Sequence, residues 1–326
     1  MRPLPLLIDP AGRVIDYLRL SVTDACQIHC LYCRDPGIGR LADRPLSDEH
    51  LETFVQACLG LGLRTVRITG GEPTLRHGLV PLMARLRELD AGLDLALTTN
   101  GLTLAKRDLA AGLKSAGLDR INISIDSTDP DVFATITRGG RLQDCLDGIH
   151  AALDAGLHPV KLNAVLLAGV NDDVRGLLQL TYDLPVHVRF IEYMTFPIRD
   201  VPEYRPMDEI TPQLLEFGEP EPVGGPPGAG PATYVRLPGA QGTVGFIDPR
   251  RREHFCAACR RIRLTPDGQL RLCLFGDVEY DVRGVLESGG GVPELQELIR
   301  QAVADKPDDF FVSTGAIQRT FSQIGG

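Results

Sequence analysis

The chain has 326 residues, enough for one large core with a smaller appendage, and its 43% hydrophobic and 24% charged residues are ordinary for a soluble globular protein. The net charge of −9 argues against broad nucleic-acid binding but leaves room for an anionic substrate in a locally basic pocket. No apolar run reaches membrane-spanning length and residues 1–12 lack the pattern of a secretory signal, so we expect a cytoplasmic protein that binds neither nucleic acid nor membrane.

Runs of β-like composition alternate with helical patterns over the first two thirds of the chain. The expected strands are 17–22, 65–69, 93–98, 120–125, 160–166 and 186–191. The expected helices between them include 47–61, 79–89, 106–116, 142–155 and 174–182. Strands that alternate with helices predict a parallel sheet with helical crossovers. Six such units predict an α/β fold, an incomplete (β/α)6 parallel barrel with a C-terminal extension.

Residues capable of chemistry follow several of these strands directly. Cys26 follows the first strand, 70–72 the second, Asn100 the third, Asp126 the fourth and Met194 the sixth. In parallel barrels the carboxyl ends of the strands carry the site. We therefore expect the functional residues at that edge.

The segment 218–232 (GEPEPVGGPPGAGPA) is rich in glycine and proline and is expected to be a mobile surface loop or linker. Its glycines lack the flanking strand and helix that a nucleotide-binding loop needs. Beyond it we expect short strands and a helix near 293–303. The expected organisation is a partial barrel over 1–217, a loop over 218–232 and a C-terminal region over 233–326.

The first cysteine set has the spacing Cys26-x3-Cys30-x2-Cys33. Three thiolates this close suit an iron–sulfur cluster, and a [4Fe–4S] cube normally takes four. A loop with three cysteines leaves one iron open to a small molecule. The spacing therefore argues against three merely packed thiols.

The second set has the spacing Cys256-x2-Cys259-x13-Cys273. Zinc is the main alternative here, because Cys-x2-Cys is common in zinc sites and His254 could supply a fourth ligand. The spacing between His254 and Cys256 is tight for a tetrahedral site, so a second three-cysteine cluster is favoured. Cys58 and Cys145 lie in helical patterns and are expected to be packed thiols.

The first cysteine loop resembles the signature of the radical S-adenosylmethionine (SAM) superfamily, with Tyr32 at the aromatic position before the third cysteine. In that superfamily SAM chelates the open iron and is cleaved to a 5′-deoxyadenosyl radical. The segment 70–73 (GGEP) resembles the superfamily's motif for the SAM amino group. The segment 124–126 (SID) resembles its ribose-side strand.

The sequence around the second cysteine set, 255–265 and 267–275, resembles the GTP 3′,8-cyclase family of molybdenum cofactor biosynthesis, and the resemblance extends from about 12 to 326. It implies a lyase that converts GTP to 3′,8-cyclo-7,8-dihydro-GTP after the radical removes the C3′ hydrogen. It also implies two [4Fe–4S] clusters and SAM as cofactors. The second cluster's open iron would bind the guanine base.

The same resemblance assigns residues to the site, because their positions match the family's motifs. The positions that match SAM contacts are Tyr32, Gly71, Glu72, Ser124 and Met194. The positions that match GTP contacts are Arg19, Arg67, Thr98, Lys161, Arg189, Arg261 and Arg263. Arginine suits bidentate phosphate contact. The closing Gly325-Gly326 would enter the active site, although glycines at a terminus ordinarily favour a frayed tail.

The family further implies an electron donor such as a flavodoxin or ferredoxin, and cyclic pyranopterin monophosphate synthase as a transient partner. The sequence leaves a homodimer open. One alternative is another radical SAM enzyme with an auxiliary cluster, such as a peptide-modifying maturase, although those usually carry more C-terminal cysteines. A two-cluster electron-transfer protein is a non-enzymatic alternative, but it would not need the SAM motifs.

Overall fold

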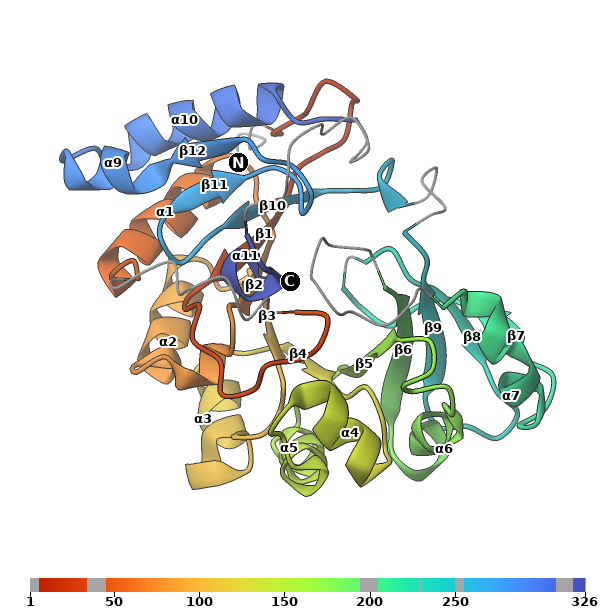
Figure 1. Cartoon of the computed structure of the whole chain (residues 1–326). Coiled ribbons are helices and arrows are strands. Elements are labelled where there is room, and N and C mark those ends of the chain that lie inside the picture. The colour runs from red at the N-terminus through yellow and green to blue at the C-terminus, as the bar shows by residue number, and fades with distance from the viewer. Residues whose placement is uncertain are drawn as a thin grey trace. The chain divides into compact units, whose positions relative to one another are not determined.

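The computed structural model describes residues 6–33, 45–193, 205–228, 230–249, 255–308 and 319–325 (Figure 1). The chain divides into two compact units. The first unit comprises Met1–Cys26, Asp35–Leu97 and Arg252–Gly326, and the second comprises Gln27–Arg34 and Thr98–Arg251. No described helix is both long and apolar enough to cross a bilayer.

The sheet of the first unit joins the beginning of the chain to its end. Its strands, in spatial order, are β12 (Glu279–Asp281), β11 (Gln269–Arg271), β10 (Arg261–Leu264), β1 (Tyr17–Ser21), β2 (Thr65–Thr69) and β3 (Asp94–Thr99), whose last two residues belong to the second unit. Strands β10, β1, β2 and β3 are parallel, whereas β11 and β12 are antiparallel to their neighbours. The C-terminal region therefore contributes a strand directly beside β1.

Within the described residues, the helices of the first unit are α1 (Asp48–Gly60), the 3₁₀ turn η1 (Pro73–Leu75), α2 (Leu79–Leu89), α9 (Val282–Glu287), α10 (Val292–Ala304) and the single turn α11 (Phe321–Ile324). Helix α1 begins at Ser47, whose Oγ accepts a hydrogen bond from the His50 amide at 3.2 Å. It packs against α2 and α10 (Figure 1). Cys58 is buried in α1, so its expected role as a packed thiol is confirmed.

The second unit has a parallel core of β4 (Arg120–Ser124), β5 (Val160–Leu166), β6 (Val186–Glu192) and β9 (Thr243–Ile247), followed by the antiparallel strands β8 (Thr233–Arg236) and β7 (Glu221–Val223). Its helices are η2 (Lys106–Asp108), α3 (Leu109–Ser115), α4 (Pro130–Thr137), α5 (Leu142–Asp154), α6 (Arg175–Asp183), η3 (Met207–Ile210) and α7 (Thr211–Leu215). Helix α5 buries Cys145, as expected.

The six expected strands and the helices between them are confirmed, with ends that differ by one or two residues. The helix expected over 106–116 is instead divided into η2 and α3, because Arg107 and Asp108 have positive φ angles of 53° and 52°. The expectation of a loop throughout 218–232 is wrong, since 221–223 form β7. Pro222 is accommodated because β7 is the last strand of the sheet, where a missing amide donor costs no ladder bond.

Candidate active site

The first cysteine loop is fixed to the end of α4 by its backbone. The His29 amide donates to the Thr137 carbonyl at 2.9 Å, and the Leu31 amide donates to the Ile136 carbonyl at 3.0 Å. Within the loop, the Cys33 amide donates to the Cys30 carbonyl at 3.0 Å. The thiols of Cys30 and Cys33 are therefore presented from a backbone that is already ordered, as a cluster-binding loop requires.

The Tyr32 side chain ties this loop to the end of β4. Its hydroxyl donates to Asp126 Oδ2 at 2.8 Å, while Asp126 Oδ1 accepts from the Val165 amide at 2.8 Å. Asn171 Nδ2 donates to the Asp126 carbonyl at 2.8 Å. Burial raises the pKa of Asp126 to about 6, although the hydrogen bonds from Val165 and Tyr32 oppose the rise. Tyr32 stays neutral, because burial and the neighbouring carboxylate raise its pKa well above the usual value.

Gly71 allows two backbone segments of the first unit to meet. Its amide donates to the Thr23 carbonyl at 2.7 Å, and the next amide, of Glu72, donates to the Ala25 carbonyl at 2.7 Å. A Cβ at Gly71 would lie 2.5 Å from the Ala25 carbonyl oxygen. Only glycine fits this contact, which fixes the backbone that leads into Cys26.

The Glu72 carboxylate is buried and caps η1. Its Oε1 accepts from the Thr74 amide at 3.0 Å and from the Thr74 hydroxyl at 2.6 Å. Of the other positions expected to contact SAM, Ser124 ends β4, where its carbonyl accepts a weak hydrogen bond from Cys145 Sγ at 3.7 Å. Met194 lies outside the described residues.

The second cysteine set lies wholly in the first unit. Cys256 and Cys259 occupy one turn, in which the Cys259 amide donates to the Cys256 carbonyl at 2.9 Å, and Cys273 follows β11. None of the three forms a disulfide, and all three are half-buried. Arg13 Nη1 donates to the Cys256 carbonyl at 3.0 Å and thereby holds the turn from the N-terminal side.

Lys306 brings a positive charge to this cysteine set. Its Nζ donates to the carbonyls of Arg261, at 3.0 Å, and of Leu272. Burial would raise the pKa of the Cys259 thiol, but Lys306 and Arg261 outweigh burial and lower it. A lowered thiol pKa favours the thiolate, which is the form that binds metal. Nothing in the sequence pointed to Lys306, because an isolated lysine after a helix is ordinarily solvated.

The donor set fits an iron–sulfur cluster, because cysteine thiolates are the usual ligands of such clusters and Lys306 favours the thiolate form of Cys259. Across the described ranges, no three side chains of His, Cys, Asp or Glu lie close enough together to hold a single metal ion. A cube does not require that arrangement, since each thiolate binds a different iron. His254, the alternative zinc ligand, lies outside the described residues.

Three arginines stand side by side on neighbouring parallel strands of the first unit. Arg263 of β10 pairs in register with Arg19 of β1, which pairs with Arg67 of β2. Adjacent strands are about 4.8 Å apart, so the three side chains leave the same face at one level. Arg67 and Arg263 are 3% and 8% exposed. Together we call these three residues the arginine row, and Arg261 lies two residues before Arg263 on the same face.

Burial of like charges costs free energy that is reflected in the pKa values. Burial and the neighbouring Arg263 lower the pKa of Arg19 well below its usual value. Burial and Arg261 lower the pKa of Arg263 to about 10. A polyanion bound at the row would relieve this repulsion, so the arrangement is typical of a phosphate site.

The C-terminal segment ends against the arginine row. The Gly325 carbonyl accepts hydrogen bonds from Arg19 Nε and from Arg263 Nη1, both at 2.8 Å. Gly325 has a φ of +69°, and a Cβ there would lie 2.5 Å from Thr69 Cγ2. The chain end is therefore docked and not frayed as far as Gly325, and Gly326 lies outside the described residues.

The second unit carries its own basic side chains on one face of its sheet. Lys161 pairs in register with His187, and Asn163 pairs with Arg189. Lys161 Nζ donates to the Pro227 carbonyl at 2.7 Å, and Arg189 Nε donates to Asn163 Oδ1 at 2.9 Å. Burial and Lys161 lower the pKa of His187 to about 4, which keeps its ring neutral at pH 7. Thr98, another expected GTP contact, is half-buried near the end of β3.

Comparisons with known proteins identify the family of the chain. Residues 20–181 match the radical SAM superfamily, and residues 186–312 match the family described as Molybdenum Cofactor Synthesis C. The chain is similar over 88% of its length to the crystal structure of Streptococcus suis SuiB bound to S-adenosylmethionine, with a TM-score of 0.64, 13% identity and 69% of that chain covered. This likeness shows the fold alone and confirms the expected radical SAM architecture.

Much closer relatives are named GTP 3′,8-cyclase. The protein from Pelotomaculum thermopropionicum is 45% identical, with 98% of this chain and 99% of that protein covered. The protein from Geobacter sulfurreducens is 44% identical over 98% and 99% of the two chains. Identity at this level over nearly the whole length, with both cysteine sets and the arginine row in place, shows that the chain belongs to the GTP 3′,8-cyclase family of radical SAM enzymes.

Proposed function

We propose that this protein converts GTP to 3′,8-cyclo-7,8-dihydro-GTP in the first step of molybdenum cofactor biosynthesis. The observation that carries the proposal is the arginine row of Arg19, Arg67 and Arg263, in the same compact unit as the second cysteine set. The relatives that are 45% and 44% identical over their full lengths support the same reaction. The row provides charge for a triphosphate, and the radical SAM loop provides the chemistry that GTP cyclisation needs.

The cofactors of the proposed reaction are SAM and two [4Fe–4S] clusters. Membership in the radical SAM superfamily implies the first cluster, at Cys26, Cys30 and Cys33, together with SAM. When bound and reduced, this pair supplies a 5′-deoxyadenosyl radical that can take the C3′ hydrogen of the ribose. The second cluster, at Cys256, Cys259 and Cys273, is our proposal, and the lowered pKa of Cys259 supports it.

The protein's own side chains supply position and charge. Planar guanidiniums of the arginine row can each form two parallel hydrogen bonds with phosphate oxygens. The Gly325 carbonyl, which accepts from Arg19 and Arg263, fixes the direction in which these two side chains point. Arg261 is proposed as a further phosphate contact of this unit. The contacts of Lys161, Arg189 and Thr98 with GTP, and those of Tyr32, Gly71, Glu72, Ser124 and Met194 with SAM, remain proposals.

The deciding experiment is anaerobic incubation with SAM, a strong reductant and GTP. We expect 5′-deoxyadenosine to form in a GTP-dependent manner together with cyclised nucleotide, and ATP to replace GTP poorly. A peptide-modifying maturase would cleave SAM only with a peptide, and an electron carrier would change redox state without cleaving SAM. Either of these results would contradict the proposed cyclase activity. The 13% identity to SuiB supports no peptide substrate, because it shows the fold alone.

Further parts of the proposal concern partners and organisation. A flavodoxin or ferredoxin is the proposed electron donor, and cyclic pyranopterin monophosphate synthase is proposed to receive the product. We also propose a cytoplasmic location and a functional boundary near residue 217. Reconstitution with a purified flavodoxin in place of a chemical reductant would test the first of these, since turnover must then depend on the flavodoxin concentration.

A further inference from the structure

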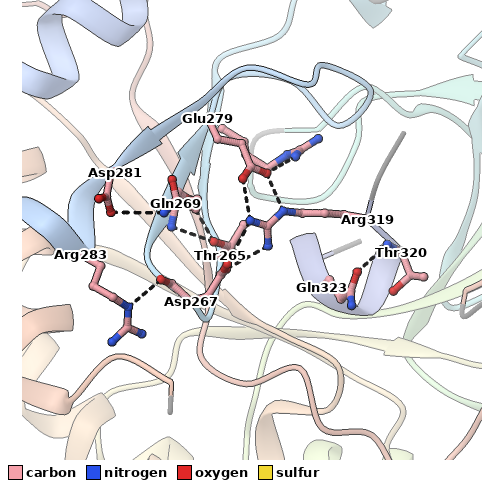
Figure 2. A network of polar contacts seen from close by, with 10 residues as sticks. Thr265, Asp267, Gln269, Glu279, Asp281, Arg283, Arg319, Thr320 and Gln323 are labelled. Carbon is pink, nitrogen blue, oxygen red and sulfur yellow. Dashed lines mark hydrogen bonds and ion pairs between the residues drawn. The ribbon is translucent and has the colours of Figure 1, made fainter. Parts of the chain in front are cut away.

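A network of ion pairs surrounds Arg319, which lies two residues before the start of α11 (Figure 2). Arg319 Nη1 and Nη2 donate to the two carboxylate oxygens of Asp267 at 2.9 and 3.0 Å. Arg319 Nη2 also donates to Glu279 Oε2 at 2.6 Å, and its Nε lies 2.5 Å from Glu279 Oε1. The Arg319 side chain is only 10% exposed. One guanidinium therefore makes bidentate contact with two carboxylates at once.

Asp267 lies in the tight turn between β10 and β11, so it is held by the sheet. Gly268 has a φ of +86° in this turn, and Arg283 Nε donates to the Asp267 carbonyl at 2.8 Å. Burial would raise the pKa of Asp267, but the hydrogen bonds from Arg319 and Thr265 lower it, so the carboxylate is charged at pH 7. The first partner of Arg319 is thus an anion in the turn that follows β10, the strand that carries Arg263.

Glu279 extends the network toward the second cysteine set. Arg271 forms an ion pair with the same Glu279 carboxylate and donates to the Gly276 carbonyl. Gly276 belongs to the segment between β11 and β12, which also contains Cys273. The Glu279 carboxylate therefore lies between the C-terminal segment on one side and the Cys273 segment on the other.

The few residues after Arg319 are compact and buried. The Thr320 amide donates to Gln323 Oε1 at 2.9 Å, which closes the turn, and Ile324 is 0% exposed. The next residue is Gly325, whose carbonyl meets Arg19 and Arg263 of the arginine row. A single helical turn therefore connects Arg319 to this carbonyl.

We propose that Arg319 is a positioning residue that clamps the C-terminal segment to Asp267 and Glu279 and so places the Gly325 carbonyl against the arginine row. Through Glu279 and Arg271, the same clamp couples the position of the C-terminal segment to that of the segment between β11 and β12, which carries Cys273. Ordering a chain end costs conformational entropy, and glycine costs the most. The doubly bidentate contact of Arg319 with Asp267 and Glu279 opposes that cost. The catalytic consequence of the clamp rests on the proposed function, but its structural consequence does not.

The test compares Arg319→Gln with the parent in the full-length, anaerobically reconstituted protein. We expect amide hydrogen exchange over 320–325 to accelerate at least tenfold, while iron content and SAM affinity remain at parent values. We also expect kcat for GTP cyclisation to fall at least tenfold, with 5′-deoxyadenosine formed in excess of cyclised product. Arg319→Lys keeps one charged contact, so it should show a smaller acceleration of exchange over 320–325 and a smaller loss of kcat than Arg319→Gln.

Arg283→Gln is the matched control, because Arg283 also donates to Asp267 but, among the described residues, has no hydrogen bond or ion pair with 319–325. We expect it to leave exchange over 320–325 unchanged. If Arg319→Gln does not fold, Asp267→Asn is the milder variant and should give the same acceleration. Unchanged exchange over 320–325 in a folded variant overturns the clamp. A parent enzyme that makes no cyclised nucleotide, but whose segment loosens in Arg319→Gln, overturns the proposed function and leaves the clamp standing.

Discussion

Arg263 combines burial, a lowered pKa and a contact with the chain end, so it is the residue at which a loss of charge should be most informative. We expect Arg263→Ala to weaken GTP binding by about 10- to 150-fold, because a charge-assisted phosphate contact contributes roughly 1.5–3 kcal/mol. Calorimetric titration with GTP and, separately, with SAM measures the effect. SAM affinity should not change. Substitution of the exposed Arg300 of α10 by Ala is the control and should change neither affinity. A fall in SAM affinity with GTP affinity intact would contradict the assignment of Arg263 to the GTP site.

The Asp126 carboxylate should make stability depend on pH. Its pKa is raised to about 6 in the folded protein by burial, whereas an unfolded Asp titrates near about 3.9. Between these values the folded state holds the extra proton, so stability falls as pH rises from about 4 to about 6 and stays lower above that. A shift of about two pKa units corresponds to roughly 3 kcal/mol.

Asp126→Asn cannot titrate, so we expect the variant to lose this dependence. Urea unfolding of the cluster-free protein at several values between pH 4.5 and 7.5 measures it for parent and variant. If the free energy of unfolding depends on pH equally in both proteins, another group is responsible for the dependence. Asn retains an acceptor for the Val165 amide and a donor for the Tyr32 oxygen, so the fold of the loop should survive the substitution.

At the scale of elements, the junction between the end of β2 and the segment before Cys26 depends on a missing side chain. We expect Gly71→Ala to push this segment away, because its Cβ would lie 2.5 Å from the Ala25 carbonyl oxygen. The variant should then lose the first cluster, and iron should fall from about eight to about four per chain. Gly224→Ala is the control, since a Cβ there meets nothing within 4 Å. Full iron content in Gly71→Ala would show that the junction tolerates the methyl group.

The turn α11 ends in a residue that only glycine fills without strain. Gly325→Val adds a side chain at a φ of +69° and against Thr69 Cγ2, so the carbonyl can no longer meet Arg19 and Arg263 together. We expect folding and both clusters to persist, SAM cleavage to become weaker or uncoupled, and cyclised nucleotide to fall at least tenfold. Product analysis by chromatography decides it. Parent-rate formation of cyclised nucleotide would refute a role for the docked end.

For the whole molecule, the two cysteine sets should act as separate metal sites. Replacing Cys256, Cys259 and Cys273 together with Ala should reduce iron from about eight to about four per chain, while SAM cleavage remains measurable and GTP turnover disappears. Replacing Cys26, Cys30 and Cys33 should also leave about four irons but abolish SAM cleavage. Stoichiometric zinc in fully active, anaerobically purified protein would contradict the second cluster.

Local pattern determined much of this protein. Strand and helix positions followed from apolar periodicity, because the spacing of apolar residues within an element determines which of its faces is buried. The spacing of each cysteine set was equally local, and it predicted two iron–sulfur clusters without knowledge of the fold. Family motifs then assigned Arg19, Arg67 and Arg263 to GTP, although nothing in the sequence alone shows that these residues are neighbours.

Tertiary structure decided which of these residues meet. Arg19, Arg67 and Arg263 align because parallel pairing of β10, β1 and β2 sets one register, and register between distant strands is not a property of any single segment. Lys306 and Arg319 look like ordinary solvated cations in the sequence, yet each is buried against partners that lie tens of residues away. Their positions depend on long-range packing, and only the folded chain brings their partners together.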